Sequence, residues 1–418
     1  MKNLLKRIIG LVCMVVLAFT FIGCGATSMD NVITLTVWGA EEDQALLREL
    51  CSDYAKANPN KQYNFLFGVQ AEGDALNNLL NDIQAGPDVF SFASDQINSF
   101  ISAGALARIG GDIESAVKSE NSEASIDSAT VNMGGEDRLY AYPTTGDNCY
   151  FLYYNKAVYT DESKVLTLDG LLEVASAKGK QVHFRLNEDG WYLSSFFFAQ
   201  PELKYEVTYD EQMNEKAVSI NYNNAKGLQV MKALANYVAN PNFVVKTDDA
   251  KMLAGVRDGS ISAFVTGTWN ATAVKQAWGD NLGVMKLPTA TIGGEQKQLI
   301  SFFGFKLLGV NNYSSNKSEA HKLAQFLTNE QSQLKRFNAR GFAPTNKVVA
   351  DMEQVKSNQV ISAVYAQAEF SRTQKGVPSS YWSPMASLIT PIVAANGTGF
   401  GDATLQGYLD SFVSAVRK

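Results

Sequence analysis

Three of the five tryptophans lie beside turn residues rather than inside apolar stripes. A flat ring at a loop edge can stack on the C–H face of a pyranose, while polar neighbours form hydrogen bonds with its hydroxyls. Carboxylates and an amide precede Trp191, hydroxyls and an amide flank Trp269, and hydroxyls flank Trp382, so the pattern favours sugar binding. The alternative is that the rings cap the hydrophobic core. The three rings and their segments are Trp191 in 187–192, Trp269 in 266–270 and Trp382 in 379–384.

The sequence has few residues for metal binding, histidine-based catalysis or disulfide formation. Its 418 residues contain four cysteines and two histidines, His183 and His321, neither with a partner at ligand spacing. Zinc sites, histidine-based catalysis and a disulfide scaffold are therefore disfavoured, and we expect no metal and no cofactor. The 36 Lys and Arg against 42 Asp and Glu give a net charge of −6, without a basic cluster. This balance argues against a nucleic-acid partner.

The N-terminus has the features of a secretion signal. A basic start precedes the apolar stretch 8–22, which at 15 residues is shorter than the roughly 20 that a bilayer span needs. The sequence at 21–24, Phe-Ile-Gly-Cys, resembles a bacterial lipobox. We predict a lipoprotein signal peptide at 1–23, lipidation of Cys24, and a tether at 24–31 that holds the protein on the extracellular face of the cytoplasmic membrane. An uncleaved anchor helix is the alternative.

Strands and helices alternate along the rest of the chain, which is typical of βαβ units and of mainly parallel sheets flanked by helices. No Gly/Ser/Pro linker divides the chain, so we expect two lobes joined by more than one crossing. Residues beyond 317 are predicted to be mostly helical. The predicted strands are 32–38, 63–69, 89–92, 149–154, 181–184, 262–265 and 299–310. The predicted helices are 43–57, 74–85, 168–177, 191–198 and 225–238.

Several short segments occur in an order and spacing that resemble a known family. They are Trp38 followed by Glu41-Glu42-Asp43, Gly86-Pro87-Asp88-Val89, Tyr142-Pro143, Gly267-Thr268-Trp269, residues 338–345, and Tyr381-Trp382. Together they resemble extracellular solute-binding proteins of carbohydrate ABC importers, with the best match to the maltose and maltodextrin branch. The resemblance extends over about residues 30 to 417.

The resemblance implies an α/β, two-lobe periplasmic-binding-protein fold, type II-like, with a sugar clamped between the lobes. Each lobe is expected to hold a mainly parallel sheet flanked by helices. Hinge crossings are expected near 144–149, 299–303 and 344–350. The N-terminal lobe would comprise 32–145 and 300–345, and the C-terminal lobe 146–299 and 346–418.

The same resemblance implies which residues contact the sugar. Carboxylates would accept hydrogen bonds from its hydroxyls, with an amide beside them, and aromatic rings would stack on its faces. The polar set is Glu41 or Glu42, Asp95, Gln96 and Asp147. The aromatic set is Phe92, Trp191, Trp269 and Trp382, with Tyr381 beside the last.

The leading hypothesis is a monomeric, non-enzymatic receptor that binds a malto-oligosaccharide, closes around it and docks on an ABC permease in the membrane. Two alternatives stay open. One is a surface-tethered glycoside hydrolase, for which Glu188 and Asp147 would be the carboxylate pair. The other keeps the fold and changes the cargo to another oligosaccharide, such as a β-linked glycan.

Overall fold

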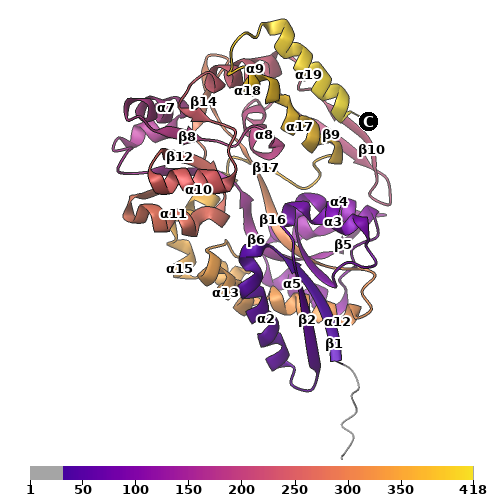
Figure 1. The fold of residues 1–418 in the computed structure, drawn as a ribbon. Coiled ribbons are helices and arrows are strands. Elements are labelled where there is room, and N and C mark those ends of the chain that lie inside the picture. Colours follow the sequence, from indigo (N-terminus) through magenta and orange to yellow (C-terminus); the bar gives the residue numbers. More distant parts are fainter. Residues whose placement is uncertain (1–31, 418) are drawn as a thin grey trace, which may run out of the picture.

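The structure, a computed structural model, describes residues 32–417. Two sheets and their helices form two lobes, one above the other in Figure 1. The predicted signal peptide at 1–23, the lipidation site Cys24 and the tether at 24–31 fall outside the described residues. Within residues 32–417, no helix combines the length and apolarity that a membrane span requires.

The first lobe is built on a six-stranded sheet of order β2-β1-β3-β16-β17, in which β6 also pairs with β16. Strand β1 is parallel to β2 and β3, whereas β16 is antiparallel to β3 and β6. The sheet is therefore mixed, more so than the expected mainly parallel arrangement. The strands are β1 (Val32–Gly39), β2 (Gln62–Val69), β3 (Val89–Ala93), β6 (Ala141–Cys149), β16 (Ser301–Val310) and β17 (Ser371–Thr373).

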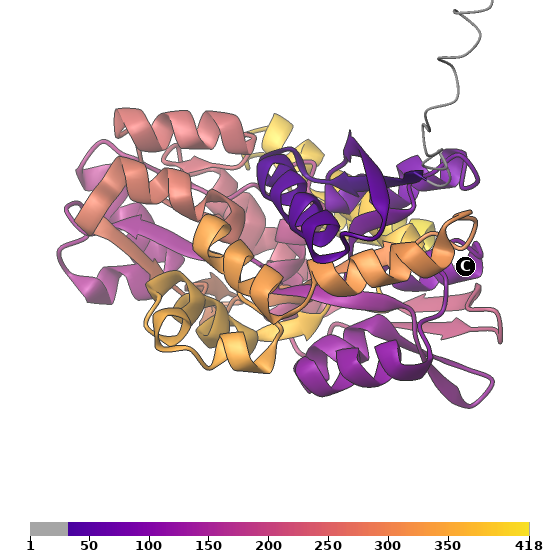
Figure 2. The ribbon, with the colours of Figure 1, turned by 90° about the horizontal axis from the view of Figure 1, so that it is seen from below.

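Helices from both ends of the sequence cover this sheet. Figure 2 shows α2 beside the later helix α12, and the two are in contact. The predicted helix at 74–85 ends early, at Asn81, because Asp82 is extended and its side chain accepts a hydrogen bond from the backbone N–H of Ala85. The helical segments are η1 (Glu41–Asp43), α2 (Gln44–Ala57), η2 (Glu72–Asp74), α3 (Ala75–Asn81), η3 (Ser94–Gln96), α4 (Ile97–Ser102), α5 (Gly111–Glu120), α6 (Glu123–Ala129), α12 (Lys317–Leu327) and α13 (Glu330–Arg340).

The second lobe is built on a five-stranded sheet of order β11-β8-β12-β7-β13. Successive side chains of a strand point to opposite faces. Accordingly, Leu152 and Tyr154 pack in one hydrophobic core and Phe151 and Tyr153 in another. The apolar run is thus a strand covered on both faces. The strands are β7 (Phe151–Asn155), β8 (Gln181–His183), β11 (Phe243–Val244), β12 (Ile261–Thr266) and β13 (Leu282–Met285).

The helices of the second lobe begin at recognisable caps. The side chains of Asp189, Asn224 and Asp248 accept backbone N–H groups at the starts of α8, α9 and α10. The predicted bounds of α7 and α9 are confirmed. The segments are η4 (Glu162–Leu166), α7 (Leu168–Ala177), α8 (Gly190–Phe198), α9 (Ala225–Val238), α10 (Asp249–Asp258), η5 (Thr268–Asn270), α11 (Ala271–Trp278), η6 (Gly279–Asn281), α14 (Lys347–Ala350), α15 (Glu353–Lys356), α16 (Gln359–Ala368), η7 (Ser379–Tyr381), α17 (Trp382–Leu388), α18 (Thr390–Ala394) and α19 (Asp402–Val416).

Three two-stranded hairpins complete the secondary structure of the described chain. They are β4 (Thr130–Met133) with β5 (Glu136–Leu139), β9 (Tyr205–Tyr209) with β10 (Glu215–Ile220), and β14 (Thr289–Ile292) with β15 (Glu295–Gln298). The short strand β17 interrupts the region predicted to be mostly helical, because it pairs with the first residues of β16.

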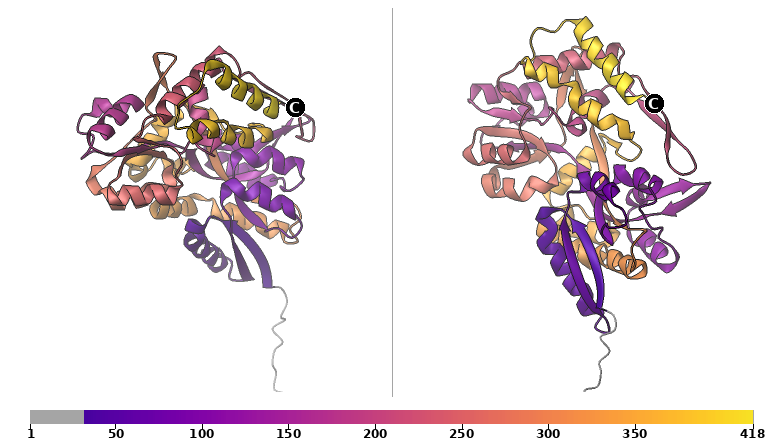
Figure 3. Two further views of the ribbon diagram at one scale, coloured as in Figure 1. Left: turned by 45° about the horizontal axis from the view of Figure 1, so that its top comes forward. Right: turned by 45° about the vertical axis from the view of Figure 1, so that its right-hand side comes forward.

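The lobes are joined by strands that run from one lobe into the other (Figure 3). Strand β16 contributes Phe302 to the core of the second lobe and Leu307 to that of the first. Strand β6 contributes Tyr142 to the first lobe and ends at Cys149 in a second-lobe core. A third segment pairs with β6, since the backbone N–H of Gly146 donates to the carbonyl of Ala343 at 2.8 Å. The lobe boundaries named above stay a prediction.

Both cysteines of the described chain are free and buried. Cys51 lies in the core of the first lobe and Cys149 in a core of the second. Burial raises the pKa of the Cys51 thiol to about 12, and it also raises the pKa of Cys149. Both thiols are therefore protonated, unreactive core residues at neutral pH.

Candidate functional site

A cavity with about 1080 Å³ of empty space, part of it open to solvent, lies between the lobes. The first lobe contributes polar and charged side chains, whereas the second lobe contributes three half-buried indoles. The two walls are thus chemically different. The first-lobe residues are Glu42, Glu72, Gly73, Asn77, Ala93, Asp95 and Lys306, and the second-lobe residues are Trp191, Trp269 and Trp382. Asn148 and Gln374 lie where the chain passes between the lobes.

Trp191 and Trp269 lie together on the second-lobe wall. Their ring centroids are 5.9 Å apart, with an angle of 37° between the planes. Trp191 is held in the first turn of α8, where its backbone N–H donates to the capping Asp189 at 3.0 Å. The indole N–H of Trp269 donates to Asp249 at 3.0 Å. The first bond fixes the backbone that carries Trp191 and the second fixes the ring of Trp269, both before any ligand arrives.

Gly267 makes room for the ring of Trp269. A Cβ atom at Gly267 would lie 1.9 Å from a carbon of that ring, far inside van der Waals contact. The Gly267-Thr268-Trp269 segment therefore needs glycine at its first position so that the indole can fold back over the backbone.

Trp382 opens α17 and packs on Phe302, with 5.4 Å between ring centroids. Helix α17 lies so close to α8 that a Cβ at Gly190 would be 3.0 Å from the carbonyl oxygen of Trp382. This close approach places Trp382 beside the wall that carries Trp191.

Gln374 connects the two walls through one amide group. Its Nε2 donates to Asp95 on the first-lobe wall at 2.8 Å. Its Oε1 accepts from the Asn148 amide at 2.9 Å and from the indole N–H of Trp191 at 3.3 Å. The amide is 5% exposed and uses both ends, so its orientation is fixed.

Asp95 lies in η3 at the end of β3, with its carboxylate at the cavity. Burial raises its pKa to about 7, although the hydrogen bond from Gln374 favours the charged form. Its carboxylate is therefore a strong acceptor for a hydroxyl only when the pH keeps it ionised. No group of His, Cys, Asp and Glu residues in the described range is arranged to hold a metal ion.

A family model described as "Bacterial extracellular solute-binding protein" matches residues 49–363 of this sequence. The chain belongs to this family. A galactooligosaccharide-binding protein of Bacillus subtilis is 26% identical over 314 residues, which cover 73% of this chain and 72% of the relative. A maltotriose-binding protein of Pyrococcus abyssi is 22% identical, over 76% of this chain and 67% of the relative.

Solved structures share the fold of this solute-binding protein. One, solved with acarbose, is 33% identical, has a TM-score of 0.79, and is matched over 92% of this chain and 99% of its own. A maltodextrin-binding protein of L. casei BL23, solved without ligand, has a TM-score of 0.73 at 24% identity, over 93% of this chain and 99% of its own. The expected two-lobe α/β fold is confirmed.

The structure places five of the ten predicted contact residues of the solute-binding protein at this cavity. These are Glu42, Asp95, Trp191, Trp269 and Trp382. Glu41 is exposed in η1 and does not line the cavity, so of the two adjacent glutamates only Glu42 faces it.

Two predicted stacking residues are buried instead. Phe92 is fully buried in the core of the first lobe, where it packs on Phe100 with ring centroids 5.0 Å apart. Tyr381 is also fully buried, and its hydroxyl lies 2.7 Å from that of Ser194. Neither ring has a free face for a ligand in this structure, because core side chains cover both.

Two predicted polar contacts hold the backbone instead. The amide of Gln96 donates to the carbonyls of Glu72 and Gly73 at 2.8 and 2.9 Å, which positions η2. Asp147 is 1% exposed and accepts from the Thr268 hydroxyl at 2.8 Å and from the backbone N–H of Ala343 at 3.0 Å. Burial raises the pKa of Asp147. It joins two crossing segments rather than lining the cavity.

Sequence reasoning missed several residues of the cavity wall. Only one carried a usable signal: Lys306 is a lone charge in the apolar run of β16, where burial of a cation needs a reason. Amides such as those of Asn148 and Gln374 do not stand out in a chain rich in Asn and Gln. The missed side chains are Glu72, Asn77, Asn148, Lys306 and Gln374.

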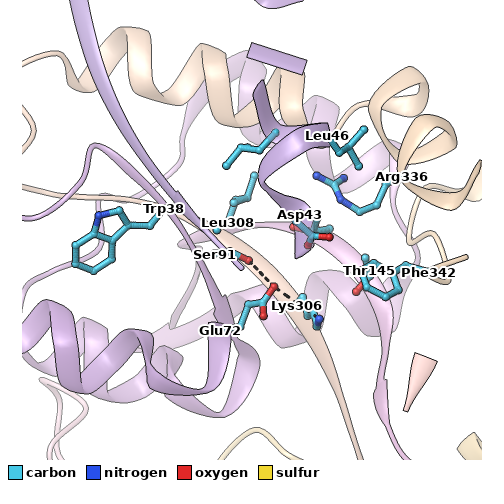
Figure 4. A pocket seen from close by; sticks show the side chains of 13 residues that line it. Trp38, Asp43, Leu46, Glu72, Ser91, Thr145, Lys306, Leu308, Arg336 and Phe342 are labelled. Carbon is cyan, nitrogen blue, oxygen red and sulfur yellow. Dashed lines mark hydrogen bonds and ion pairs between the residues drawn. The ribbon is translucent and has the colours of Figure 1, made fainter. Parts of the chain in front are cut away.

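A narrower cavity adjoins the first and shares Glu72 and Lys306 with it (Figure 4). It extends through the first lobe toward the crossing segment that carries Phe342. Its other charged lining residues are Asp43 and Arg336. The Glu72 and Lys306 side chains therefore form the boundary between the interlobe cavity and the interior of the first lobe.

Asp95→Asn should remove a pH-dependent cost of folding while keeping an acceptor for Gln374. The unfolded chain ionises Asp near pH 4, but the folded protein does so only near the raised pKa of about 7. The wild type thus loses stability as the pH rises between these values. Urea unfolding should show the variant gaining free energy of unfolding relative to wild type over this window, with a constant difference above it. A pH-independent difference would contradict this assignment.

Gly267→Ala should displace the indole of Trp269, because the added methyl overlaps its ring. We expect a changed tryptophan emission spectrum and weaker ligand binding, measured by fluorescence titration. Gly401→Ala is a suitable control: Gly401, like Gly267, precedes a helical segment and has a negative φ, but no atom lies near its Cβ position. Equal binding by the Gly267 variant and wild type would show that Trp269 is not required.

Proposed function

We propose that this solute-binding protein captures a malto-oligosaccharide in the interlobe cavity and delivers it to the permease of an ABC importer. The supporting observation is the pairing of three fixed indoles on one wall with carboxylates and amides on the other. Indole faces suit the apolar faces of pyranose rings, and the opposing acceptors suit their hydroxyls. Glu42 and Asp95 would bind hydroxyls, while Trp191, Trp269 and Trp382 would stack.

Closure would follow from the difference between the walls. A sugar that stacks on the second lobe and forms hydrogen bonds with the first stabilises the conformation in which both walls reach it at once. Strands β6 and β16 would bend where each passes from one lobe to the other, near the predicted lobe boundaries at 145/146 and 299/300. The third connection between the lobes would bend near 345/346. The closed, monomeric form is then the one that the permease would recognise.

The relatives guide the choice of cargo. One is named for maltotriose, one for galactooligosaccharides, and a structural neighbour was solved with acarbose. Malto-oligosaccharides are therefore the first ligands to test, with β-linked galacto-oligosaccharides as the competing cargo.

A receptor role fits the positions of the acids better than hydrolysis does. A glycosidase needs two carboxyl groups that flank one bond, roughly 5 to 10 Å apart. Of the pair predicted for that alternative, Glu188 is exposed outside the cavity lining and Asp147 is buried in hydrogen bonds. We therefore propose that the protein returns its sugar intact.

The family is extracellular, and we propose that lipid on Cys24 holds this member at the outer face of the membrane. Strand β1 begins at the end of the first lobe that is remote from the second lobe (Figures 1 and 3). A tether attached there would leave the cavity free to face its ligand and the permease.

Trp269→Ala should weaken maltotriose binding by about 2 kcal/mol, roughly 30-fold, since a buried aromatic anchor would be lost. Isothermal calorimetry measures the change. Trp38→Ala is the matched control, because Trp38 is also half-buried but does not line the interlobe cavity. Absence of binding heat for maltotriose and for galacto-oligosaccharides with wild-type protein would refute the proposal. Shorter sugars in the recovered samples would instead support the hydrolase.

Cys24→Ser should release the protein from the membrane. Expressed as the full chain in a bacterial host, the wild type should fractionate with membranes and incorporate labelled palmitate, whereas the variant should incorporate none. Cys51→Ser serves as the control, since Cys51 is a buried core residue. Palmitate incorporation by the Cys24 variant would exclude this anchor.

A further inference from the structure

Lys306 occupies an unusual position for a cation. It lies in β16, between the apolar residues Phe305 and Leu307, and pairs with β3 and β6 on either side. Its side chain is 12% exposed, yet it lines the interlobe cavity. The ammonium group is thus presented by one of the most constrained strands of the fold.

The contacts of this ammonium group leave its hydrogen-bonding capacity unused. Lys306 Nζ lies 3.6 Å from Glu72 Oε1 and 4.8 Å from the centre of the Phe342 ring. Among the described residues, no hydrogen bond within normal distance satisfies its three donors. The Glu72 side chain is similarly enclosed, at 11% exposure, and within residues 32–417 its carboxylate accepts one long hydrogen bond, of 3.4 Å, from Ser91.

Lys306 stays charged in this environment. Burial alone would lower its pKa, but nearby carboxylates raise it by more, so the net shift is upward. The carboxylates are Glu72, Asp147, Asp43 and Glu42. Burying a charged donor without full hydrogen bonding costs free energy, and an apolar pair of similar size is often more stable. The pair is therefore poorly explained by stability.

We propose that Lys306 and Glu72 form a donor–acceptor pair that binds two neighbouring hydroxyls of one sugar ring. The ammonium donates to one hydroxyl oxygen, and the Glu72 carboxylate accepts from the adjacent hydroxyl. This inference rests on the proposed sugar binding and adds a stereochemical requirement: one ring must present two adjacent free hydroxyls to the first-lobe wall, opposite the indoles.

Lys306 also adds a charged hydrogen-bond donor to a wall whose other charged groups are carboxylates. The other carboxylates on this wall, Glu42 and Asp95, can only accept hydrogen bonds when ionised. A ligand oxygen that needs a charged donor finds it only at Lys306 among the described cavity residues. A sugar anchored there has one ring oriented before the remaining rings settle on the second lobe.

Lys306→Met, which keeps the stem and removes the charge, should weaken maltotriose binding at least tenfold in calorimetry. Glu72→Gln should weaken it similarly. Lys286→Met is the matched control: the Lys286 ammonium also lies over a phenylalanine ring, 4.5 Å from the centre of Phe370, but outside the cavity. Urea unfolding of each variant shows whether weaker binding comes from lost stability. The neutral Lys306→Met/Glu72→Gln double variant leaves no unpaired charge, so it should fold normally and still bind weakly.

A direct readout is the ¹⁵N signal of the Lys306 ammonium group. Maltotriose should shift this signal and slow the hydrogen exchange of its protons, while the Lys286 signal stays unchanged. Maltotrioses that each lack one hydroxyl group identify the hydroxyls that are bound. Removal of either of two adjacent hydroxyls on one ring should weaken binding to wild type but should not weaken binding to the double variant further. Undiminished binding by both single variants would overturn the pair while sugar binding stands. If wild type binds neither maltotriose nor a galacto-oligosaccharide, the proposed function fails first.

Discussion

The antiparallel pairing of β6 with β16 is the constraint on which the rest of the molecule depends. Its register runs from Phe303 opposite Cys149 to Gly309 opposite Ala141, so one ladder passes from the second-lobe core into the first. Its hydrogen bonds fix the backbone on both sides of the cavity. Asn148 and Lys306 are placed by this ladder, and β17 extends it toward Gln374. The site is therefore assembled around the connection between the lobes.

The two walls of the cavity are stabilised by different forces. The indoles of the second lobe are held by apolar packing and by hydrogen bonds from Trp191 to Gln374 and from Trp269 to Asp249, and that arrangement is complete without a ligand. The first-lobe wall instead carries buried charges with incomplete hydrogen bonding. A polar ligand can therefore stabilise the first-lobe wall far more than the second-lobe wall. Under the proposed function, the second lobe would supply most of the affinity and the first lobe most of the selectivity.

The sequence predicted the order of the elements well because periodicity and caps are local properties. Helices α7 and α9 have the predicted bounds, and η1, η3 and η5 each follow a predicted strand with a side chain at the cavity. Local pattern could not tell which aromatic rings face outward. Strand β3 is buried along its whole length, so it has no alternation to distinguish Phe92 from a ring at the surface.

The polar part of the site was harder to predict for a related reason. Asp147 and Asp95 are both carboxylates near strand ends, and only tertiary contacts decide that one joins backbone segments while the other faces the cavity. Gln374 becomes important only because three partners from distant parts of the chain meet at its amide. Such roles depend on long-range geometry, for which a single sequence holds no local signature.

The burial of Cys51 and Cys149 has a practical consequence. Both thiols are protonated and enclosed, one in each lobe, so thiol-reactive reagents meet no competing native group within residues 32–417. A fluorophore pair can therefore be attached at two introduced surface cysteines, one per lobe, in an otherwise unaltered domain. The distance between the lobes then becomes an optical signal, which would report ligand binding through the proposed closure.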